Sequence, residues 1–226
     1  MEYKYQMHTH TAPTSKCART TPKELAEALH RAGSSGCVLT NHFYHGNTGV
    51  SRELAWDEFV AAYERDYLEC KREAEKYGLD ILFGIEEGVE GYSEILCYGI
   101  TPEMLYAHTE LRECSAQNWY RVLHGLGVLV IQAHPYRVLR PVPDPEPLPL
   151  ELIDGIEVYN NGNPPEDNAN AEIFAFKNPG LILTSGADTH DAESVGYGGI
   201  SADERITDPL ALVRVLREGK YRLLKP

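Results

Sequence analysis

Basic residues are scarce in this chain. It has 21 Lys and Arg against 34 Asp and Glu, which gives a formal net charge of −13. Proteins that coat nucleic acids need basic stripes that neutralise phosphates, so this balance argues against that class of protein. It does not argue against a small anionic substrate.

Long hydrophobic runs are also missing. No apolar stretch approaches the roughly 20 residues that span a bilayer, and the start, Met1-Glu2-Tyr3-Lys4-Tyr5, lacks the apolar region of a signal peptide. The five cysteines are an odd number and are scattered without any C-x-x-C spacing, which does not indicate a disulfide framework. We therefore expect a cytoplasmic protein without a membrane partner, folded as one domain over residues 1–226.

Strand and helix signals alternate along the chain, as in βα units around a parallel sheet. Apolar runs predict strands near 3–8, 37–40, 80–85, 94–99, 128–131, 153–159 and 181–184, with a short strand after the last helix. Helical spacing and capping residues predict helices near 21–31, 52–77, 115–126, 165–177 and 208–218. About seven such units in one chain favour a barrel over an open sheet.

Histidines and acidic residues stand directly after several of these strands. His8 and His10 end the first one, and residues two apart in a strand share a face, so both could bind one metal ion. Four more motifs follow in order: Thr40-Asn41-His42, Gly84-Ile85-Glu86, Ala133-His134-Pro135 and Asp188-Thr189-His190. Barrels of parallel strands gather functional groups at their carboxyl ends. A lone histidine is more often structural, but this joint pattern predicts a metal site.

This order of motifs resembles that of the PHP superfamily, named from bacterial polymerase and histidinol phosphatase. Its members carry H-x-H-T near the N-terminus, T-[DN]-H after the second strand, G-x-E after the third, an H-P pair, and a terminal S-D-x-H or G-x-D-x-H. The chain matches each motif in turn, with His8-Thr9-His10-Thr11, Thr40-Asn41-His42, Gly84-Ile85-Glu86, His134-Pro135 and Gly186-Ala187-Asp188-Thr189-His190. The resemblance implies a distorted seven-stranded (βα) TIM-like barrel with two or three divalent metal ions and phosphoesterase activity.

The resemblance also implies which residues bind each ion. The first ion would be held by His8, His10, Glu86 and Asp188; the second by Glu86 and His134; the third by His42 and His190. Glu86 would bridge two of the ions. Imidazole and carboxylate ligands suit manganese, zinc or iron and do not choose among them.

Two positions depart from the family pattern. Many relatives have a histidine where this chain has Glu94, and a carboxylate there would still bind metal but favours harder ions such as manganese. Relatives often place an Asp or His in the loop after the first motif, where this chain has Lys16 and Cys17. Lys16 would oppose a cation or contact a phosphate, whereas Cys17 could bind the third ion as a thiolate.

Three residues are candidates for catalysis: Glu86, His190 and Arg137. Arg137 follows His134-Pro135 and could grip a phosphate with two hydrogen bonds, although a surface arginine is an equal alternative. His190, or His42, could protonate the leaving oxygen if it does not bind metal. The expected reaction is hydrolysis of a small phosphorylated metabolite by a metal-activated water.

Two other functions stay open at this point. The first is a hydrolase of non-phosphate bonds, of the amidohydrolase type, whose barrels also begin with H-x-H. Many of those enzymes bridge their metals with a carboxylated lysine on a middle strand, and this chain has no lysine between Lys76 and Lys177. The second is a non-catalytic module stabilised by metal.

Several further residues are expected to lie outside the site. His30, His45, His108 and His124 are interpreted as structural or surface residues, with His45 close enough to stay a weak candidate. Glu157 and Asn160 also end a strand but could simply brace the loops. The segment Pro141–Pro149 has a proline at every second position, which predicts a stiff, extended loop that is either a lid over the site or a surface connector.

Overall fold

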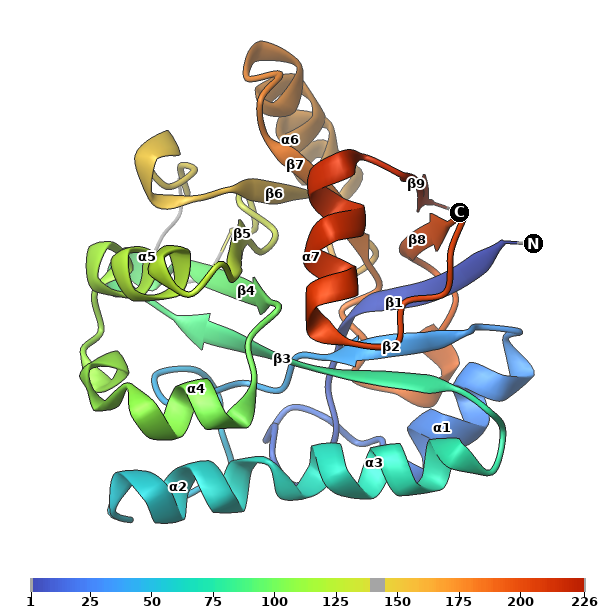
Figure 1. Ribbon diagram of the computed structural model, residues 1–226. Helices are drawn as coiled ribbons and strands as arrows, with labels where there is room; N and C mark the ends of the chain where they lie inside the picture. The colour runs from blue at the N-terminus through green and yellow to red at the C-terminus, as the bar shows by residue number, and fades with distance from the viewer. Residues whose placement is uncertain (1, 139–144, 226) are drawn as a thin grey trace.

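The computed structural model describes residues 2–138 and 145–225, whose strands form a sheet that curls around a central core (Figure 1). Its strands are β1 (Tyr3–Thr9), β2 (Gly36–Leu39), β3 (Asp80–Gly88), β4 (Glu94–Tyr98), β5 (Leu129–Gln132), β6 (Gly155–Asn160), β7 (Ile182–Gly186), β8 (Gly199–Ala202) and β9 (Tyr221–Leu224). Neighbouring strands follow the order β7-β6-β5-β4-β3-β2-β1-β8-β9. Strands β1 to β7 therefore lie side by side in chain order.

The sheet nearly closes into a barrel because the chain after β7 returns to β1. Thr9 and Thr189 form a parallel bridge. The Thr189 N–H donates to the His8 carbonyl at 3.1 Å, and the His10 N–H donates to the Thr189 carbonyl at 2.9 Å. These bonds bring the first and last predicted metal-binding motifs to the same edge.

A barrel-like α/β fold is thus confirmed, whereas the seven-stranded (βα) barrel is not. Over the described residues the sheet has nine strands, and β4 is antiparallel to both β3 and β5. Only the short segment between Gly88 and Glu94 joins β3 to β4, and a parallel crossover needs a dozen or more residues. β4 must therefore run back along β3.

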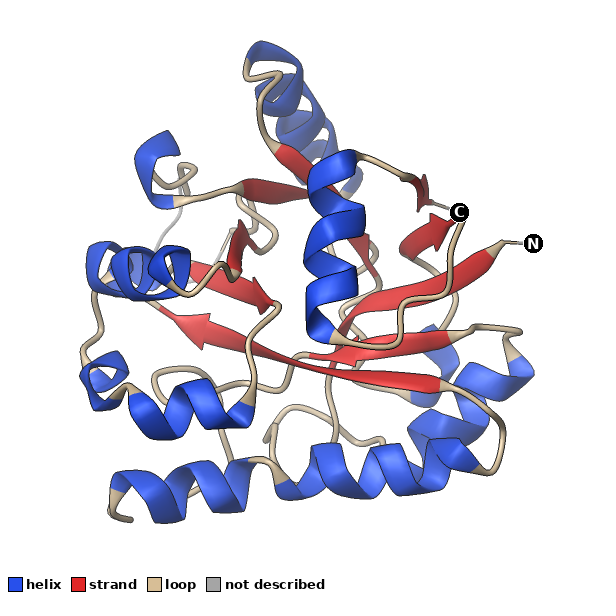
Figure 2. Cartoon of the chain, in the orientation of Figure 1, coloured by secondary structure: helices blue, strands red, loops and turns tan. Residues whose placement is uncertain are grey.

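Helices cover both faces of the sheet (Figure 2). They are α1 (Pro22–Arg31), α2 (Trp56–Tyr63), α3 (Arg65–Glu75), α4 (Pro102–Ala107), α5 (Ala116–Gly125), α6 (Pro165–Lys177) and α7 (Pro209–Glu218). The predicted helix over 52–77 starts later and is divided at Glu64, while α4 and β8 were not predicted. Within the described part of the chain, no helix is both long enough and apolar enough to cross a bilayer.

Alternating side chains of β4 separate the two cores. Ile95 and Cys97 pack into a large aromatic cluster with residues of α2, α4 and α5. Leu96 and Tyr98 pack into an inner cluster that the apolar face of α7 covers. Because side chains two apart share a face, Glu94 projects to the same inner side as Leu96. The inner face therefore carries apolar residues at one end and the polar candidates at the other.

Candidate metal centre

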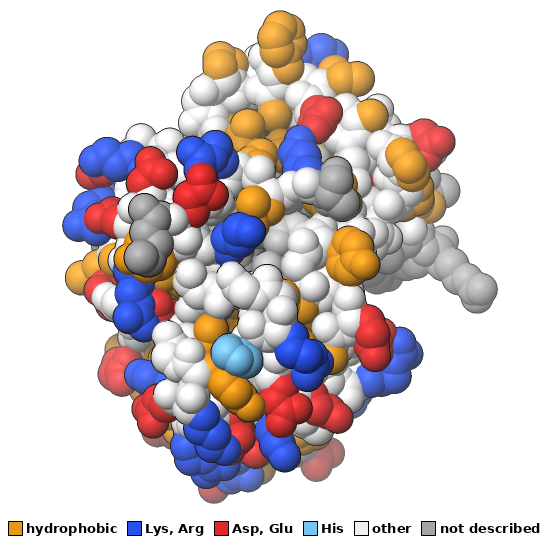
Figure 3. All heavy atoms as spheres, turned by 90° about the vertical axis from the view of Figure 1, so that its right-hand side faces the viewer, with side chains coloured by type: hydrophobic (Ala, Val, Ile, Leu, Met, Phe, Trp, Pro, Cys, Tyr) orange, Lys and Arg blue, Asp and Glu red, His pale blue; other side chains and the backbone are white. Residues whose placement is uncertain are grey.

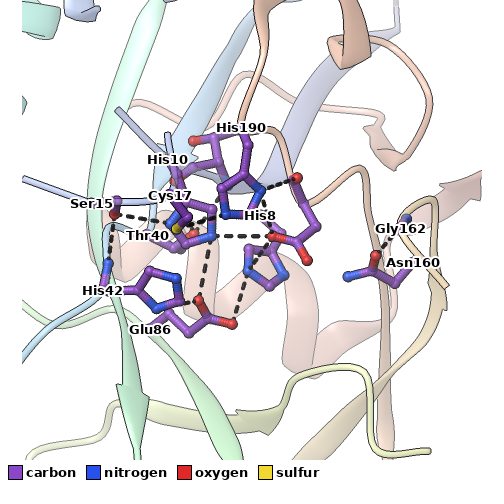
Figure 4. Close-up of polar contacts among 12 residues, drawn as sticks. His8, His10, Ser15, Cys17, Thr40, His42, Glu86, Asn160, Gly162 and His190 are labelled. Atoms are coloured by element: carbon purple, nitrogen blue, oxygen red, sulfur yellow. Dashed lines mark hydrogen bonds and ion pairs between the residues drawn. The ribbon is translucent and has the colours of Figure 1, made fainter. Parts of the chain in front are cut away.

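The structure brings all eight predicted ligands together at one end of the inner face, five of which are labelled in Figure 4. They are His8 in β1 and His10 just after it, His42 after β2, Glu86 in β3, Glu94 at the start of β4, His134 after β5, and Asp188 and His190 after β7. His8 and His10 are fully buried, and Glu86 is 1% exposed. Segments far apart in the sequence thus form one dense cluster.

Glu86 lies at the middle of this cluster. Its Oε1 is 3.1 Å from His8 Nε2 and 3.2 Å from His134 Nε2. Its Oε2 is 2.9 Å from His42 Nδ1 and 3.3 Å from His10 Nε2. Each carboxylate oxygen therefore faces two imidazole nitrogens, and a carboxylate in this central position could contact more than one ion.

Asp188 faces the first histidine pair from the opposite side. Its Oδ1 lies 3.4 Å from His8 Nε2 and 3.3 Å from His10 Nε2. Four groups of side chains place their ligand atoms within 4.8 Å of one another: His8, His10 and Asp188; His8, Glu86 and His134; His42, Glu86 and Glu94; and His10, His42 and His190. The groups share members, so neighbouring ions would share ligands.

The hydrogen bonding of the centre fits a metal cation. His8 Nε2, His10 Nε2, His42 Nδ1 and Glu86 Oε2 are buried and have no hydrogen-bond partner. Buried polar atoms without partners cost about 1–3 kcal/mol each. A divalent cation among these lone pairs would satisfy them at once, and mixed nitrogen and oxygen donors suit zinc, manganese or iron.

Burial and charge act in opposite directions on these groups. Burial opposes protonation of His8, but the carboxylates of Asp188 and Glu86 raise its pKa well above the ordinary value. Burial lowers the pKa of His10 to about 3. Burial would raise the pKa of Glu86 too, yet the His8 and His42 imidazoles hold it well below its usual range. The Glu86 carboxylate is therefore ionised and available as a ligand, whereas burial raises the pKa of Glu94.

Hydrogen bonds from surrounding residues orient the first two histidines. His8 Nδ1 lies 3.1 Å from Glu157 Oε1, so it carries the proton and leaves Nε2 free. Ser15 Oγ donates its proton to Asn41 Oδ1 at 2.9 Å and can therefore only accept from His10 Nδ1 at 3.2 Å. In the neutral form that metal binding requires, both imidazoles would direct the Nε2 lone pair into the centre.

The sequence analysis missed Ser15 and treated Glu157 only as a brace. Glu157 does brace the site, since its Oε2 also accepts from the His134 N–H at 3.1 Å and from Asn160 Nδ2 at 2.8 Å. A carboxylate within the strand-like run Ile156–Val158 was a visible signal for this role. Ser15 gave no comparable signal, because a hydroxyl in a loop has many ordinary uses.

Arg137 is held by the protein on three sides. Its Nη1 donates to Asp188 Oδ2 at 2.6 Å, its Nη2 to Asn160 Oδ1 at 2.7 Å, and its Nε to Asn163 Oδ1 at 2.8 Å. Arginine has five N–H donors, so two are left for another acceptor. Arg137 therefore positions Asp188 first and could contact a phosphate second.

The group of His10, His42 and His190 extends to Cys17. The Cys17 sulfur lies 3.0 Å from His190 Nε2. Burial raises the pKa of the Cys17 thiol, but hydrogen bonds with His190 and His42 outweigh this and lower the pKa to about 6. The preceding Lys16 is exposed at the surface. Of the two residues that depart from the family pattern here, Cys17 is the one beside the cluster.

Two candidate ligands have unusual backbone conformations. His134 has φ 26° and Asp188 has φ 51°. Positive φ is uncommon for residues other than glycine and tends to occur at functional sites, where the surrounding structure enforces it. Both residues follow a strand, and the bend turns their side chains toward the centre.

The remaining histidines lie elsewhere. His30 stacks on Tyr77, His108 pairs with Glu110, and His124 lies 3.6 Å from Asp154. His45 lines a pocket of about 490 Å³ that Glu94 also borders. It is the nearest of the four to the centre, as the sequence suggested.

The proline-rich segment is only partly described. Residues 139–144, which include Pro141 and Pro143, lie outside the described residues. Pro145 and Glu146 line a small pocket together with Glu94, His134 and Arg137. The described end of the segment therefore borders the centre, and its role as a lid stays a prediction.

Gly186→Ala is expected to destabilise the protein by about 1–3 kcal/mol through overpacking. A Cβ at this position would lie 2.1 Å from Glu157 Oε1 and 2.6 Å from His8 Cβ, so it would also displace a ligand and its brace. Urea unfolding and the number of bound metal ions would measure both effects. Gly180→Ala is the matched control, because its Cβ would meet nothing within 4 Å; equal effects of the two variants would contradict the prediction.

No family model matches the chain, and no curated protein matches it in sequence. Solved structures do match. A two-domain protein from Bacteroides vulgatus that contains a predicted PHP-like metal-dependent phosphoesterase aligns over 100% of this chain, with a TM-score of 0.73 and 15% identity. This chain spans 65% of that protein's length.

Two further structures are similar. A candidate metal-dependent phosphoesterase from Bifidobacterium adolescentis aligns over 95% of this chain and 96% of its own, with a TM-score of 0.59 and 17% identity. A lesion-specific endonuclease from Pyrococcus furiosus aligns over 99% of this chain and 58% of its own, with a TM-score of 0.66 and 13% identity. The resemblance to PHP-like phosphoesterases is therefore confirmed at the level of the fold.

Proposed function

We propose that this chain is a metal-dependent hydrolase of phosphate esters. The observation that carries the proposal is the buried Glu86 carboxylate, which faces four imidazoles, three of which have a buried nitrogen without a hydrogen-bond partner. A structural ion needs one closed set of ligands. Overlapping ligand groups around one carboxylate instead favour two or three neighbouring ions, which is an arrangement suited to phosphoryl transfer.

The proposed ligand sets combine members of the four overlapping groups with the contact between Glu94 and His134. His8, His10, Asp188 and Glu86 would hold the first ion, Glu86, His134 and Glu94 the second, and His42 and His190 the third. When bound, the ions would activate a water for attack on phosphorus and neutralise the charge that develops on the phosphate oxygens.

The chain's own residues prepare this reaction. Glu157 fixes the orientation of His8, and Arg137 fixes that of Asp188 while keeping two N–H donors for a phosphate oxygen. Where His190 does not bind an ion, its imidazole could protonate the leaving oxygen. Glu86, His190 and Arg137 are accordingly the proposed catalytic residues.

The proposed substrate is a small phosphate monoester. Carboxylates of Glu90, Glu94 and Glu146 line the pockets beside the centre, with Arg137 as the basic residue among their linings. Figure 3 shows acidic and basic side chains interspersed over the face beside β8 and β9, with no basic stripe gathered there. The acidic residues that line the pockets disfavour a long polyanion. Because the similar endonuclease acts on DNA lesions, a nucleic acid must be among the substrates tested.

The proposed setting is the reducing cytoplasm, in which all five cysteines would stay free thiols, as they are in the structure. The proposed molecule is a single domain. Its fold carries every proposed ligand within residues 8–190.

Hydrolysis of a panel of phosphomonoesters, followed by phosphate release, and of cyclic nucleotides and DNA oligonucleotides, followed by separation of the products, would test the proposal. Metal-stripped protein should hydrolyse its substrate only after manganese or zinc is added, and Asp188→Ala should reduce hydrolysis to background. Cleavage of DNA alone would correct the substrate. No hydrolysis of any ester by metal-loaded protein would overturn the proposed activity.

A further inference from the structure

Cys17 is a ligand of neither the first nor the second proposed ion, and its surroundings are unusual for a structural thiol. Cys37, Cys70 and Cys97 are buried among apolar residues. Cys17 is only half-buried, and its sulfur instead faces His190, a member of the group of His10, His42 and His190. The question is whether this contact is an ordinary thiol–imidazole pair or part of a metal site.

The proton positions around His190 decide which lone pair faces the sulfur. His190 Nδ1 lies 2.8 Å from the backbone carbonyl of Asp188. A carbonyl oxygen can only accept, so Nδ1 carries the ring proton of the neutral imidazole. Nε2 therefore directs its lone pair at Cys17 Sγ, 3.0 Å away. The thiol can donate its S–H proton to this lone pair, and once that proton is lost the sulfur and the nitrogen are both free to bind one cation.

His42 is the second imidazole beside Cys17. Its side chain is 9% exposed, and its Nδ1 is buried without a hydrogen-bond partner and lies 2.9 Å from Glu86 Oε2. The His42 ring also interacts with the Cys17 thiol, and a ligand atom of His42 lies within 4.8 Å of those of His10 and His190. These three imidazoles form one ligand group, to which a thiolate at Cys17 would add a further donor.

We propose that Cys17 is a thiolate ligand of an ion held together with His42 and His190. This inference rests on the proposed metal centre, though not on the proposed substrate. On binding, the S–H proton would leave to solvent and the sulfur would donate an electron pair to the cation. Soft thiolate ligands favour zinc or ferrous iron over manganese. The third position would thus prefer a softer ion than the carboxylate-rich second position beside Glu94.

Cobalt titration of the whole metal-stripped protein under reducing conditions tests this directly. Wild-type protein should develop the near-ultraviolet charge-transfer absorption of a thiolate bound to Co²⁺. Cys17→Ser should lose this absorption and should bind about one equivalent of Co²⁺ less. The zinc affinity of the third position should fall by at least about tenfold, because even the loss of a residue that only supports a ligand usually lowers metal affinity that much. Cys114→Ser is the matched control at an exposed cysteine and should behave as wild type.

Cys17→Asp provides a second variant with a harder ligand. It should keep the third ion without the charge-transfer absorption and should shift the preference toward manganese. Alkylation by iodoacetamide, read by mass spectrometry, covers the case in which Cys17→Ser does not fold. Zinc should protect Cys17 in the wild type and leave Cys114 reactive.

The outcomes separate this inference from the proposed function. Charge-transfer absorption that persists in Cys17→Ser, or alkylation of Cys17 that zinc does not slow, would overturn the thiolate ligand and leave a simple thiol–imidazole pair. Metal-dependent phosphate release could still occur in that case. Conversely, absorption that depends on Cys17 in a protein that hydrolyses no ester would support the ligand and reject the proposed activity.

Discussion

Glu86→Gln is expected to lower metal-dependent phosphate release by on the order of 10³-fold while the protein stays folded. The substitution replaces one carboxylate oxygen by an NH₂ group, which has hydrogens to donate and no lone pair for a metal. Each oxygen of Glu86 faces two imidazoles, so either orientation of the amide would remove a bridging contact. A loss of about 4 kcal/mol in transition-state stabilisation corresponds to this factor, since each 1.36 kcal/mol is tenfold.

The neighbouring Glu87 offers a matched control on the opposite face of β3. It is fully buried, and burial raises its pKa to about 8. Near neutral pH its protonated acid is similar in shape and charge to glutamine, so Glu87→Gln should leave phosphate release and stability close to wild type. Values of kcat/KM and bound metal for both variants would check the prediction. Full activity of Glu86→Gln would show that this carboxylate does not bridge.

The position of the site could be predicted from the sequence because the motifs follow apolar strands. Strand ends meet at one edge of a sheet, so His10, His42 and His134 needed only the correct strand order to come together. The structure places them there. Helical spacing also predicted a helix near 52–77, and the apolar residues Phe59 and Tyr63 of this segment are buried in α2.

The direction of β4, which carries the predicted ligand Glu94, shows what apolar patterning could not predict. A parallel barrel would put the start of every strand at the end opposite the site. Because β4 runs antiparallel to β3, its first residue pairs with Gly88 at the end of β3. Glu94 therefore reaches the centre from the start of its strand, 3.5 Å from His134 Nε2. Strand direction depends on loop length and pairing, which apolar patterning does not specify.

His8 depends on another feature that is not visible in the sequence. Tyr5 and Met7 belong to the inner core, and strict alternation would turn His8 to the other face. The pairing of β1 with β2 has a register shift between Gln6 and Thr9. Irregularities of this kind redirect side chains beside active sites. Here His8 reaches the inner carboxylates of Glu86 and Glu157.

Removal of the metals is expected to abolish turnover and to lower stability at the same time. An ion present at 1,000 times its dissociation constant contributes about 4.1 kcal/mol to the free energy of unfolding. For a protein of about this size each kcal/mol shifts Tm by about 2–4 °C, so loss of one such ion should lower Tm by about 8–16 °C. The unpartnered atoms of His8, His10 and Glu86 are the physical reason, because without an ion they stay buried and unsatisfied.

Stepwise return of the metal distinguishes an enzyme from a metal-stabilised module. Melting temperature, bound equivalents and phosphate release would be followed together as manganese or zinc is added to stripped protein. If the centre is catalytic, Tm should rise with the first equivalent, whereas turnover should appear only when the ions on both sides of Glu86 are present, because the reaction needs both. Glu87→Gln should reproduce the wild-type curves. A structural module would regain its full Tm as the ions are returned but would hydrolyse no ester at any metal concentration. That result would favour a structural role for the whole centre.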